Sequence, residues 1–297
     1  MAKSVYEIIT EKIIEKLESG VVPWRKPWSN ANAVNWKTQK PYRGINTFLV
    51  EPGEYASKKQ ILEAGGRIKR EEMKHSHIIV YWLWKEKEDE ESKEKKKYAK
   101  PFYYRVWEIN KQCTGLKSKN TYETFNHDPI EKAEEIFKGY VHSPDYTFQS
   151  GQAVYYPTLD RINCPPISDF KVSEEYYCTL FHEMIHSTGH TSRLARTGIT
   201  AKGAAFGDEV YSKEELVAEM GAAMLCGVAG IDNSTIDNSA SYIDSWLRVL
   251  KKENRIILQA ASQAQKASDY ILGGYSIRMK ELLIGASIIA GANGAHG

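Results

Sequence analysis

Apolar residues recur at helical spacing at the start of the chain. Within residues 4–19 every third or fourth position is apolar and charged side chains lie between, which predicts an amphipathic helix ended by a glycine. A second helix is predicted over residues 57–64, with Gly65 and Gly66 after it as a stop signal. The segment between the two helices includes residues 21–44, which are rich in Pro, Asn and Trp and predict an ordered irregular loop.

Two stretches of β-branched and aromatic residues predict a pair of strands. They cover residues 77–84 (HIIVYWLW) and residues 101–109 (PFYYRVWEI). The run between them, residues 85–100, mixes Lys and Glu with almost nothing apolar. We therefore expect a long exposed hairpin loop or a disordered insertion there, with the role of a solvated spacer.

The pattern changes after residue 125, where a polar stretch interrupts the hydrophobic positions. We place the boundary between two domains there, which makes residues 1–125 the first domain and residues 126–297 the second. The second half predicts mainly helices and one strand. The helices are expected at 130–139, 173–187 and 212–226 and, as a helical pair or one long helix, at 242–273. The strand is expected at 153–162, and the Gly/Ala-rich final segment is expected to be a frayed end.

Composition limits the class of protein. With 42% hydrophobic and 26% charged residues the chain is typical of a soluble globular protein. It has no apolar run near the roughly 20 residues needed to cross a bilayer, and no signal peptide at its start, so we expect a cytoplasmic protein with no membrane partner. Its four cysteines form no CxxC pair, which argues against a cysteine zinc site and predicts reduced thiols.

Charge and tryptophan divide the chain into unlike halves. Residues 1–125 carry 25 Lys/Arg and 17 Asp/Glu, a net +8, whereas the rest carries 15 and 21, a net −6, and six of the seven tryptophans lie in the basic half. Cations that follow phosphates and rings that stack on unpaired bases are what a single-stranded DNA surface requires. We assign Trp82, Trp84 and Trp107, in predicted strands, to the core. The DNA-binding candidates lie in the irregular loop: Trp24, Arg25, Lys26, Trp28, Trp36, Lys40, Tyr42 and Arg43.

The sequence HEMIH, residues 182–186, carries the chemistry of the second half. Residues four apart lie on one face of a helix, so His182 and His186 can direct imidazole nitrogens at one metal ion. The intervening Glu183 stands beside that ion as a general base for a bound water. A serine opens the predicted helix: Ser173 is expected as its N-cap, with acids in the first turn.

A third protein ligand is required, because a catalytic zinc ion keeps one position open for water. A metzincin would have histidine where this chain has Ser192, and His190 is out of register, so we assign it a surface or supporting role. The next acidic helix offers Glu215 as the ligand. Glu219, one turn later, is expected to accept a hydrogen bond from a metal-bound histidine, and Glu214 is expected to point elsewhere. The alternative is that these acids are solvated surface charges.

The order and spacing of several motifs resemble the ArdC-type antirestriction proteins of plasmids and other mobile elements. The motifs are PWRKPW, NWKTQKPYRGINTFLV, IIVYWLW, FYYRVWEINKQCTGL, YYPTLDRINCPP, YYCTLFHEMIHSTGH and EELVAEMGAAML. The resemblance implies an α+β protein with an N-terminal single-stranded DNA-binding domain and a C-terminal, mostly helical zincin-like metallopeptidase domain with a small sheet. It also implies protection of incoming conjugative DNA. The implied N-terminal motif falls on Trp24, Trp28, Tyr42, Arg43, Gly44 and Asn46.

Two other functions compete with that of a DNA-tethered zinc peptidase. One is a protein that coats single strands and uses zinc only to stabilise its fold. The other, an accessory of replication or priming, is disfavoured because no nucleotide-binding loop is present. Manganese or another divalent ion is an alternative to zinc, and the sequence indicates neither the protein substrate nor the oligomeric state.

Overall fold

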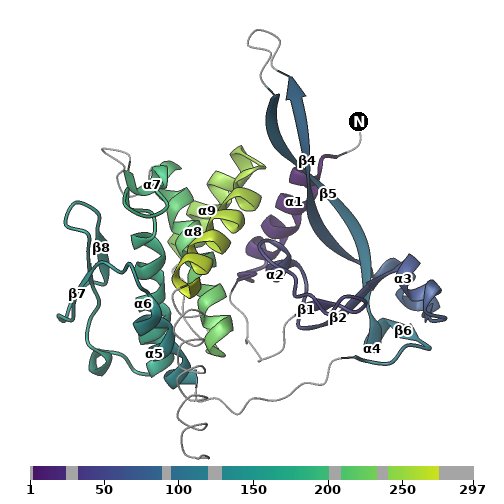
Figure 1. Ribbon diagram of the computed structural model, residues 1–297, viewed down its shortest axis with the longest axis horizontal. Helices are drawn as coiled ribbons and strands as arrows, with labels where there is room; N and C mark the ends of the chain where they lie inside the picture. The colour runs from purple at the N-terminus through teal and green to yellow at the C-terminus, as the bar shows by residue number, and fades with distance from the viewer. Residues whose placement is uncertain are drawn as a thin grey trace, which may run out of the picture. The chain divides into compact units, whose positions relative to one another are not determined.

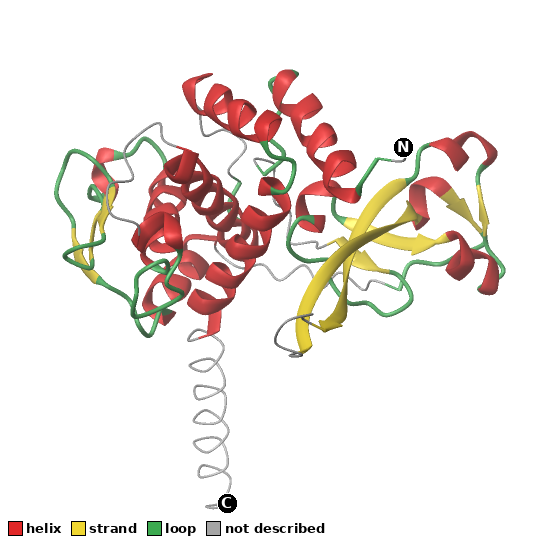
Figure 2. Ribbon diagram, turned by 90° about the horizontal axis from the view of Figure 1, so that it is seen from above, coloured by secondary structure: helices red, strands yellow, loops and turns green. Residues whose placement is uncertain are grey.

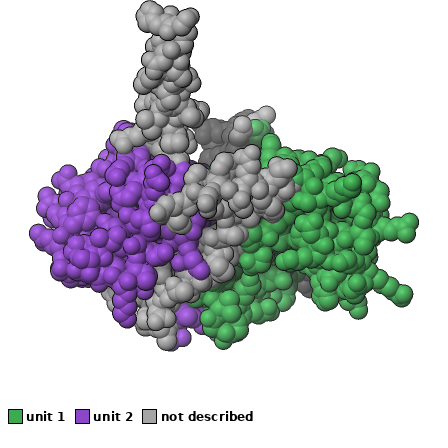
Figure 3. All heavy atoms as spheres, turned by 90° about the horizontal axis from the view of Figure 1, so that it is seen from below, with its two compact units in different colours: residues 1–23, 29–124, 250–259 green, residues 24–28, 125–249, 260–297 purple. Residues whose placement is uncertain are grey.

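The computed structural model describes residues 3–24, 33–88, 95–119, 129–200, 209–232 and 240–273. It divides into two compact units, coloured separately in Figure 3: unit 1 contains residues 1–23, 29–124 and 250–259, and unit 2 contains residues 24–28, 125–249 and 260–297. The main boundary between the two units lies after residue 124. Trp24 and the segment 250–259 depart from sequence order, because each packs on residues far away along the chain, and hydrophobic periodicity does not predict such contacts.

Unit 1 opens with helix α1, Val5–Glu18, as expected. Ser4 and Glu7 form a reciprocal capping box at its start, and Ile9 and Ile13 lie on its buried face. The segment 250–259 packs on this helix: the hydroxyl of Thr10 donates to the carbonyl oxygen of Asn254 at 2.7 Å. Burial of α1 therefore depends on a segment some 240 residues later in the chain.

The main sheet of unit 1 has the strand order β1-β2-β5-β4. Its strands are β1 (Ala33–Asn35), β2 (Gly53–Ser57), β5 (Lys95–Glu108) and β4 (His77–Glu88). Strands β1 and β2 are parallel and the other neighbours are antiparallel. In Figure 1, β4 and β5 form a two-stranded ribbon that extends well beyond the other strands.

The charged run at residues 85–100 is largely strand, contrary to the expected loop. Pairing between β4 and β5 continues to Glu88 and Lys95, and residues 89–94 lie outside the described part of the chain. A ladder of backbone hydrogen bonds forms whatever the polarity of the side chains beside it, which is why composition alone misassigned this segment.

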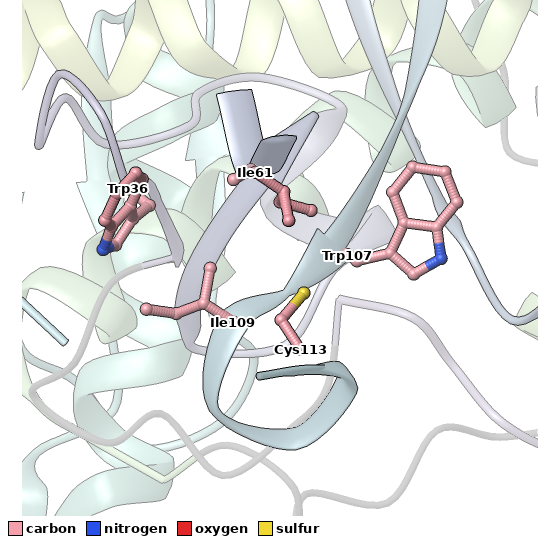
Figure 4. Packing of buried hydrophobic residues seen from close by; sticks show 6 residues of the cluster. Trp36, Ile61, Trp107, Ile109 and Cys113 are labelled. Atoms are coloured by element: carbon pink, nitrogen blue, oxygen red, sulfur yellow. The ribbon is translucent and has the colours of Figure 1, made fainter. Parts of the chain in front are cut away.

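Short elements close the core of unit 1. They are α2 (Asn46–Leu49), α3 (Lys58–Glu63), β3 (Arg67–Ile68), the 3-10 helix η1 (Arg70–Lys74), α4 (Ile109–Gln112) and β6 (Cys113–Thr114). Figure 4 shows one part of this core, in which Trp36 and Trp107 lie with Ile61, Ile109 and Cys113. The indole nitrogen of Trp36 donates to the carbonyl oxygen of Lys117 at 2.9 Å, so this ring is fixed inside the unit.

Unit 2 is mostly helical (Figure 2), and the expectation of an α+β protein with a helical second half is confirmed. Its helices are α5 (Pro129–Gly139), α6 (Ser173–Ser187), α7 (Thr197–Thr200) and α8 (Glu209–Ala229), with most of α9 (Ala240–Lys252) and most of a helical stretch at residues 256–273; η2 (Ile167–Asp169) is a 3-10 helix. The region from 242 to 273 is therefore a helical pair. The Gly/Ala-rich end, residues 274–297, lies outside the described part.

A three-stranded sheet completes unit 2, in the order β7-β9-β8. Its strands are β7 (Asp145–Thr147), β8 (Val154–Tyr156) and β9 (Arg161–Asn163). The single strand expected at 153–162 is thus an antiparallel hairpin. The chain reverses before β9 at Asp160, whose φ of 46° lies in the left-handed region.

Helices α6 and α8 pack closely together. A side chain at Gly221 would meet the side chain of Ile185 at 2.7 Å, so the glycine lets the two backbones approach. The sulfurs of the buried cysteines Cys178 and Cys226 lie 2.9 Å apart across the same interface. Within the described residues no helix is both long and apolar enough to cross a bilayer.

Candidate metal centre

Helix α6 brings the two histidines of HEMIH to one place. It begins at Ser173 itself, with Val172 in the N-cap position, so the expected serine cap is wrong, while Glu174 and Glu175 do lie in the first turn. Ring nitrogens Nε2 of His182 and His186 are 3.0 Å apart.

Glu215, on α8, completes a cluster of three donor atoms. Its carboxylate oxygens lie 3.5 Å from Nε2 of His182 and 3.2 Å from Nε2 of His186. Four ligands placed tetrahedrally at about 2.0–2.1 Å from a zinc ion are roughly 3.3 Å from one another. The three separations, 3.0, 3.2 and 3.5 Å, bracket that value, so these residues fit a single divalent ion.

Each histidine also faces a carboxylate on its other nitrogen. Nδ1 of His186 lies 3.4 Å from Glu214, and Nδ1 of His182 lies 3.6 Å from Glu219. A proton held on each Nδ1 leaves the lone pair of each Nε2 directed into the cluster. Two lone pairs at 3.0 Å repel each other unless a cation lies between them, which is a second reason to assign a metal here.

The expectation that Glu214 points elsewhere is therefore wrong. Neighbouring positions on a helix differ by about 100° in direction, which led us to separate Glu214 from Glu215. The two nitrogens of an imidazole ring also point in different directions, so His186 reaches both carboxylates at once. Glu219 lies 3.6 Å from Nδ1 of His182, and the hydrogen bond expected between them stays a prediction.

Arg196 holds Glu214 in place. Its guanidinium donates to Glu214 at 2.6 Å and to the carbonyl oxygen of Ile185 at 2.7 Å, and all of these groups are buried. A side chain at Gly198, in α7, would lie 2.6 Å from Glu214, so the backbone of α7 also closes on this carboxylate. The sequence offers no signal for this arrangement, because Arg196 lies in an irregular segment outside any motif.

The cluster attracts positive charge. Burial alone would raise the pKa of Glu215, but His186 and His182 outweigh it and hold that pKa far below its usual range. Conversely, burial alone would lower the pKa of His186, and the carboxylates of Glu215 and Glu214 raise it well above its usual value. A divalent cation is the species that satisfies two imidazoles and a carboxylate together.

The remaining motif residues surround this cluster. Glu183 is buried. Cys164, the residue after β9, is buried too, and its own burial together with the charge of Glu183 raises the pKa of its thiol to about 12. His190 is not among the three donors; its Nδ1 lies 2.7 Å from the hydroxyl of Ser192. The cluster therefore contains three candidate protein ligands among the described residues, and Glu183 follows the first of them in the chain.

A separate polar network fixes the β8–β9 turn. Arg193 forms a two-pronged ion pair with Asp160 and donates to the carbonyl oxygen of Ser187 at 2.7 Å, at the end of α6. The phenol of Tyr155 donates to Asp160 at 2.8 Å. Burial would raise the pKa of Asp160, but Arg193 and Tyr155 hold it below its usual value. This network ties the small sheet to the helix that carries the histidines.

The tryptophans follow the expected pattern only in part. Trp107, assigned to the core, is buried as expected, with 6% of its surface exposed. Trp36, assigned to a DNA-binding loop, is 7% exposed, and Trp84, assigned to the core, is 73% exposed. Trp24 was also expected on the DNA-binding surface, yet it is fully buried in unit 2 against Trp246, with ring centres 5.1 Å apart. Neither Trp24 nor Trp36 has a free face on which a base could stack, because each ring fills a core.

The other DNA-binding candidates divide into three groups. Lys40 and Arg43 are exposed, and Tyr42 is half-buried and packs on Tyr55. Asn46, from the same motif, has a structural role: its side chain donates to the carbonyl of Val80 and accepts from its amide, which closes the edge of β4. Arg25, Lys26 and Trp28 lie outside the described residues.

The two halves of the chain match two family models. Residues 131–263 match a zincin-like metallopeptidase, and residues 3–107 match the N-terminal domain of the anti-restriction factor ArdC. The first match covers both helices that carry the donor cluster, so unit 2 is of the zincin-like class.

Two solved structures agree over nearly the whole chain. The crystal structure of the antirestriction protein ArdC from plasmid R388, in metal-free form, is 32% identical, has a TM-score of 0.71 and is matched over 92% of this chain and 98% of that one. Its Mn(II)-bound form is 31% identical, over the same shares of the two chains, with a TM-score of 0.73. The chain belongs to the ArdC family of antirestriction proteins, as the sequence motifs indicated. The Mn(II)-bound relative and the zincin-like match both indicate a divalent metal.

Longer proteins contain a similar segment. Two DNA primases named TraC, from Escherichia coli, are 31% and 30% identical over 91% of this chain, which spans only 20% and 27% of their lengths. An uncharacterized protein of Sinorhizobium fredii (strain NBRC 101917 / NGR234), y4eC, is 25% identical over 95% of this chain and 96% of its own. The chain thus spans about a fifth to a quarter of the TraC proteins.

Proposed function

We propose that unit 2 is a zinc-dependent peptidase and that unit 1 binds single-stranded DNA, so that the chain protects DNA that enters a cell by conjugation. The observation that carries the enzymatic part is the convergence of His182, His186 and Glu215 with no fourth protein ligand among the described residues. A structural zinc site closes with four protein ligands, whereas a catalytic site has three and leaves a position for water. This argues against the alternative, a coating protein whose zinc is structural.

The residues of the site have different roles in the proposed hydrolysis of a peptide bond. A bound zinc ion would lower the pKa of its water to about 7 and polarise the scissile carbonyl. Glu183 would act as the general base that accepts a proton from the attacking water and returns it to the leaving amine. Glu214 and Glu219 hold the two imidazoles in the orientation that keeps Nε2 available. Two imidazoles and one carboxylate suit zinc, and manganese is the alternative because a relative binds it.

A single substitution tests the peptidase. We expect Glu183→Gln to retain zinc, measured by metal analysis, and to lower cleavage of labelled casein at least about 100-fold, because the amide cannot accept the proton. Glu174→Gln, in the first turn of the same helix, is the matched control and should cleave normally. Assays run with and without single-stranded oligonucleotide cover an activity that depends on DNA. Cleavage by the Glu183 variant at the wild-type rate would remove the proposed base.

A transfer assay separates the peptidase from the coating protein. Under our proposal, recipients that restrict incoming DNA accept a plasmid less often when it encodes Glu183→Gln than when it encodes the wild type. If the variant protects the plasmid as well as the wild type, proteolysis is dispensable and the coating function is the correct one. We expect the protein to act in the cytoplasm, where the proteins that attack the strand are its substrates.

Single-stranded DNA binding by unit 1 rests on the net charge of +8 in residues 1–125 and on the match to the ArdC N-terminal domain. The name of the TraC relatives, DNA primase, is also consistent with a segment that meets DNA strands. The test is a salt series with the full chain, because residues 250–259 belong to unit 1 and a 1–125 fragment would lack them. We expect tighter binding to a single strand than to a duplex; failure to bind at low salt would exclude this function.

A further inference from the structure

One face of the β4–β5 ribbon carries a continuous row of aromatic and basic residues. The strand register pairs Tyr81 with Phe102, Leu83 with Lys100 and Lys85 with Tyr98. Positions two apart in a strand share a face, so these three pairs lie on the same side of the ribbon. Tyr81, Leu83 and Tyr98 are 39%, 43% and 45% exposed, which is unusual for large apolar side chains in neighbouring pairs.

The rings of this face are already ordered. Tyr81 stacks on Phe102 with ring centres 5.8 Å apart and packs on Tyr104 at 5.7 Å. The amino groups of Lys100 and Lys85 lie 5.6 and 5.9 Å from the centre of the Phe102 ring. Rings held in place lose little conformational entropy when a ligand stacks on them, so this face is prepared for a planar partner.

Charge separates the two faces. At the paired positions whose side chains are described, the first face carries Lys85 and Lys100, whereas Glu86 occupies the opposite alternation. The opposite alternation also holds Trp82, which contacts Tyr6 of α1, and Trp84. An anionic ligand therefore meets two lysines and no carboxylate at the three described pairs of the first face.

We propose that this face, defined as Tyr81, Leu83, Lys85, Tyr98, Lys100 and Phe102, is the surface on which unit 1 binds single-stranded DNA. The inference rests on the proposed function. It moves the DNA-binding surface from the irregular loop at residues 21–44, where the sequence predicted it, to the ribbon. Unpaired bases stack on the rings and phosphates lie against the lysines, which is the combination that single-strand binding requires. A duplex keeps its bases stacked inside and offers the rings no flat face.

Two variants of the full chain test the surface. We expect Tyr98→Ala to raise the Kd for a labelled oligothymidylate roughly tenfold, the loss of one stacked base. The double variant Lys85→Ala, Lys100→Ala should reduce the slope of log Kd against log salt by about 1.4, the contribution of two phosphate contacts on a single strand. Trp84→Ala is the matched control: it removes a more exposed ring from the same ribbon on the other face and should leave both quantities unchanged.

The outcomes separate the surface from the function. If the wild type binds no oligonucleotide, the proposed DNA binding fails altogether. If the wild type binds and Tyr98→Ala binds equally well, or Trp84→Ala loses more affinity, DNA binds elsewhere and the inference is overturned. The face is equally refuted if the wild type sediments as a dimer that Tyr98→Ala dissociates without a change in DNA affinity, because a second copy would then be its occupant.

Discussion

The two units keep their chemistry in opposite places. In unit 2 the ionisable groups around the candidate metal centre are buried and contact one another. Arg196 donates hydrogen bonds to Glu214, and Glu214 faces His186. In unit 1 the candidate binding residues lie on an exposed ribbon, where Tyr81 and Tyr98 are 39% and 45% exposed. A buried site is therefore expected to lose both stability and function when one member changes, whereas an exposed surface should lose function alone.

The tryptophans show why the difference was hard to foresee. Trp36 follows the short strand β1 within a segment expected to be a loop, and it is buried; Trp84 lies in a long strand and is exposed. A strand buries its side chains only where another layer covers it, and the ribbon runs past the rest of its sheet. A segment with little regular structure can bury a ring when that ring fills the core beneath it.

The largest effect that this contrast predicts is at Arg196. Arg196→Met leaves the buried carboxylate of Glu214 without its cation, which we expect to lower the free energy of unfolding by about 3–5 kcal/mol. The measurement is urea denaturation of the metal-free protein. Adding Glu214→Gln should restore part of the loss, because the uncompensated charge is then gone. Equal stability of the single and double variants would contradict this coupling.

A smaller effect is predicted at Glu214 itself. Glu214→Gln preserves the shape of the side chain but weakens its hold on the Nδ1 proton of His186, so zinc affinity should fall by roughly 10- to 100-fold. Titration calorimetry with zinc alone measures this without any assay of activity. Glu174→Gln should bind zinc as the wild type does, and a normal affinity for Glu214→Gln would show that the carboxylate does not orient the histidine.

In unit 1, Trp36→Phe tests whether a predicted DNA-binding ring belongs to the core. The variant loses the hydrogen bond to Lys117 and part of the ring volume, so we expect about 1–2 kcal/mol less stability. Affinity for single-stranded DNA should not change. If the variant lost affinity for single-stranded DNA and kept its stability, Trp36 would be part of the DNA-binding surface after all.

The smallest effect is expected at the most exposed ring. Trp84→Ala removes a side chain that is 73% exposed, so the free energy of unfolding should change by no more than about 0.5 kcal/mol. Thermal denaturation of the full chain measures it. A larger loss would mean that the ribbon is packed against something at this position, and the contrast between the two units would weaken.

Much of the candidate centre could be predicted because its members lie within single helices. His182 and His186 are one turn apart on α6, and Glu215 and Glu219 are one turn apart on α8, so a periodicity of 3.6 residues relates each pair. No such rule relates His186 to Arg196, which follows a loop, or shows that two neighbouring acids contact the same ring. Those contacts depend on how helices pack against each other.

By itself the sequence determined the main helices, the apolar parts of β4 and β5, and the family, because these depend on the local spacing of side chains and on recurring motifs. Only the tertiary structure decided which tryptophans are buried, which carboxylates contact His186, and that Trp24 and residues 250–259 pack with the other part of the chain. Burial and convergence depend on segments far apart in sequence. The residues next to a side chain in the sequence do not indicate which distant segment will pack against it.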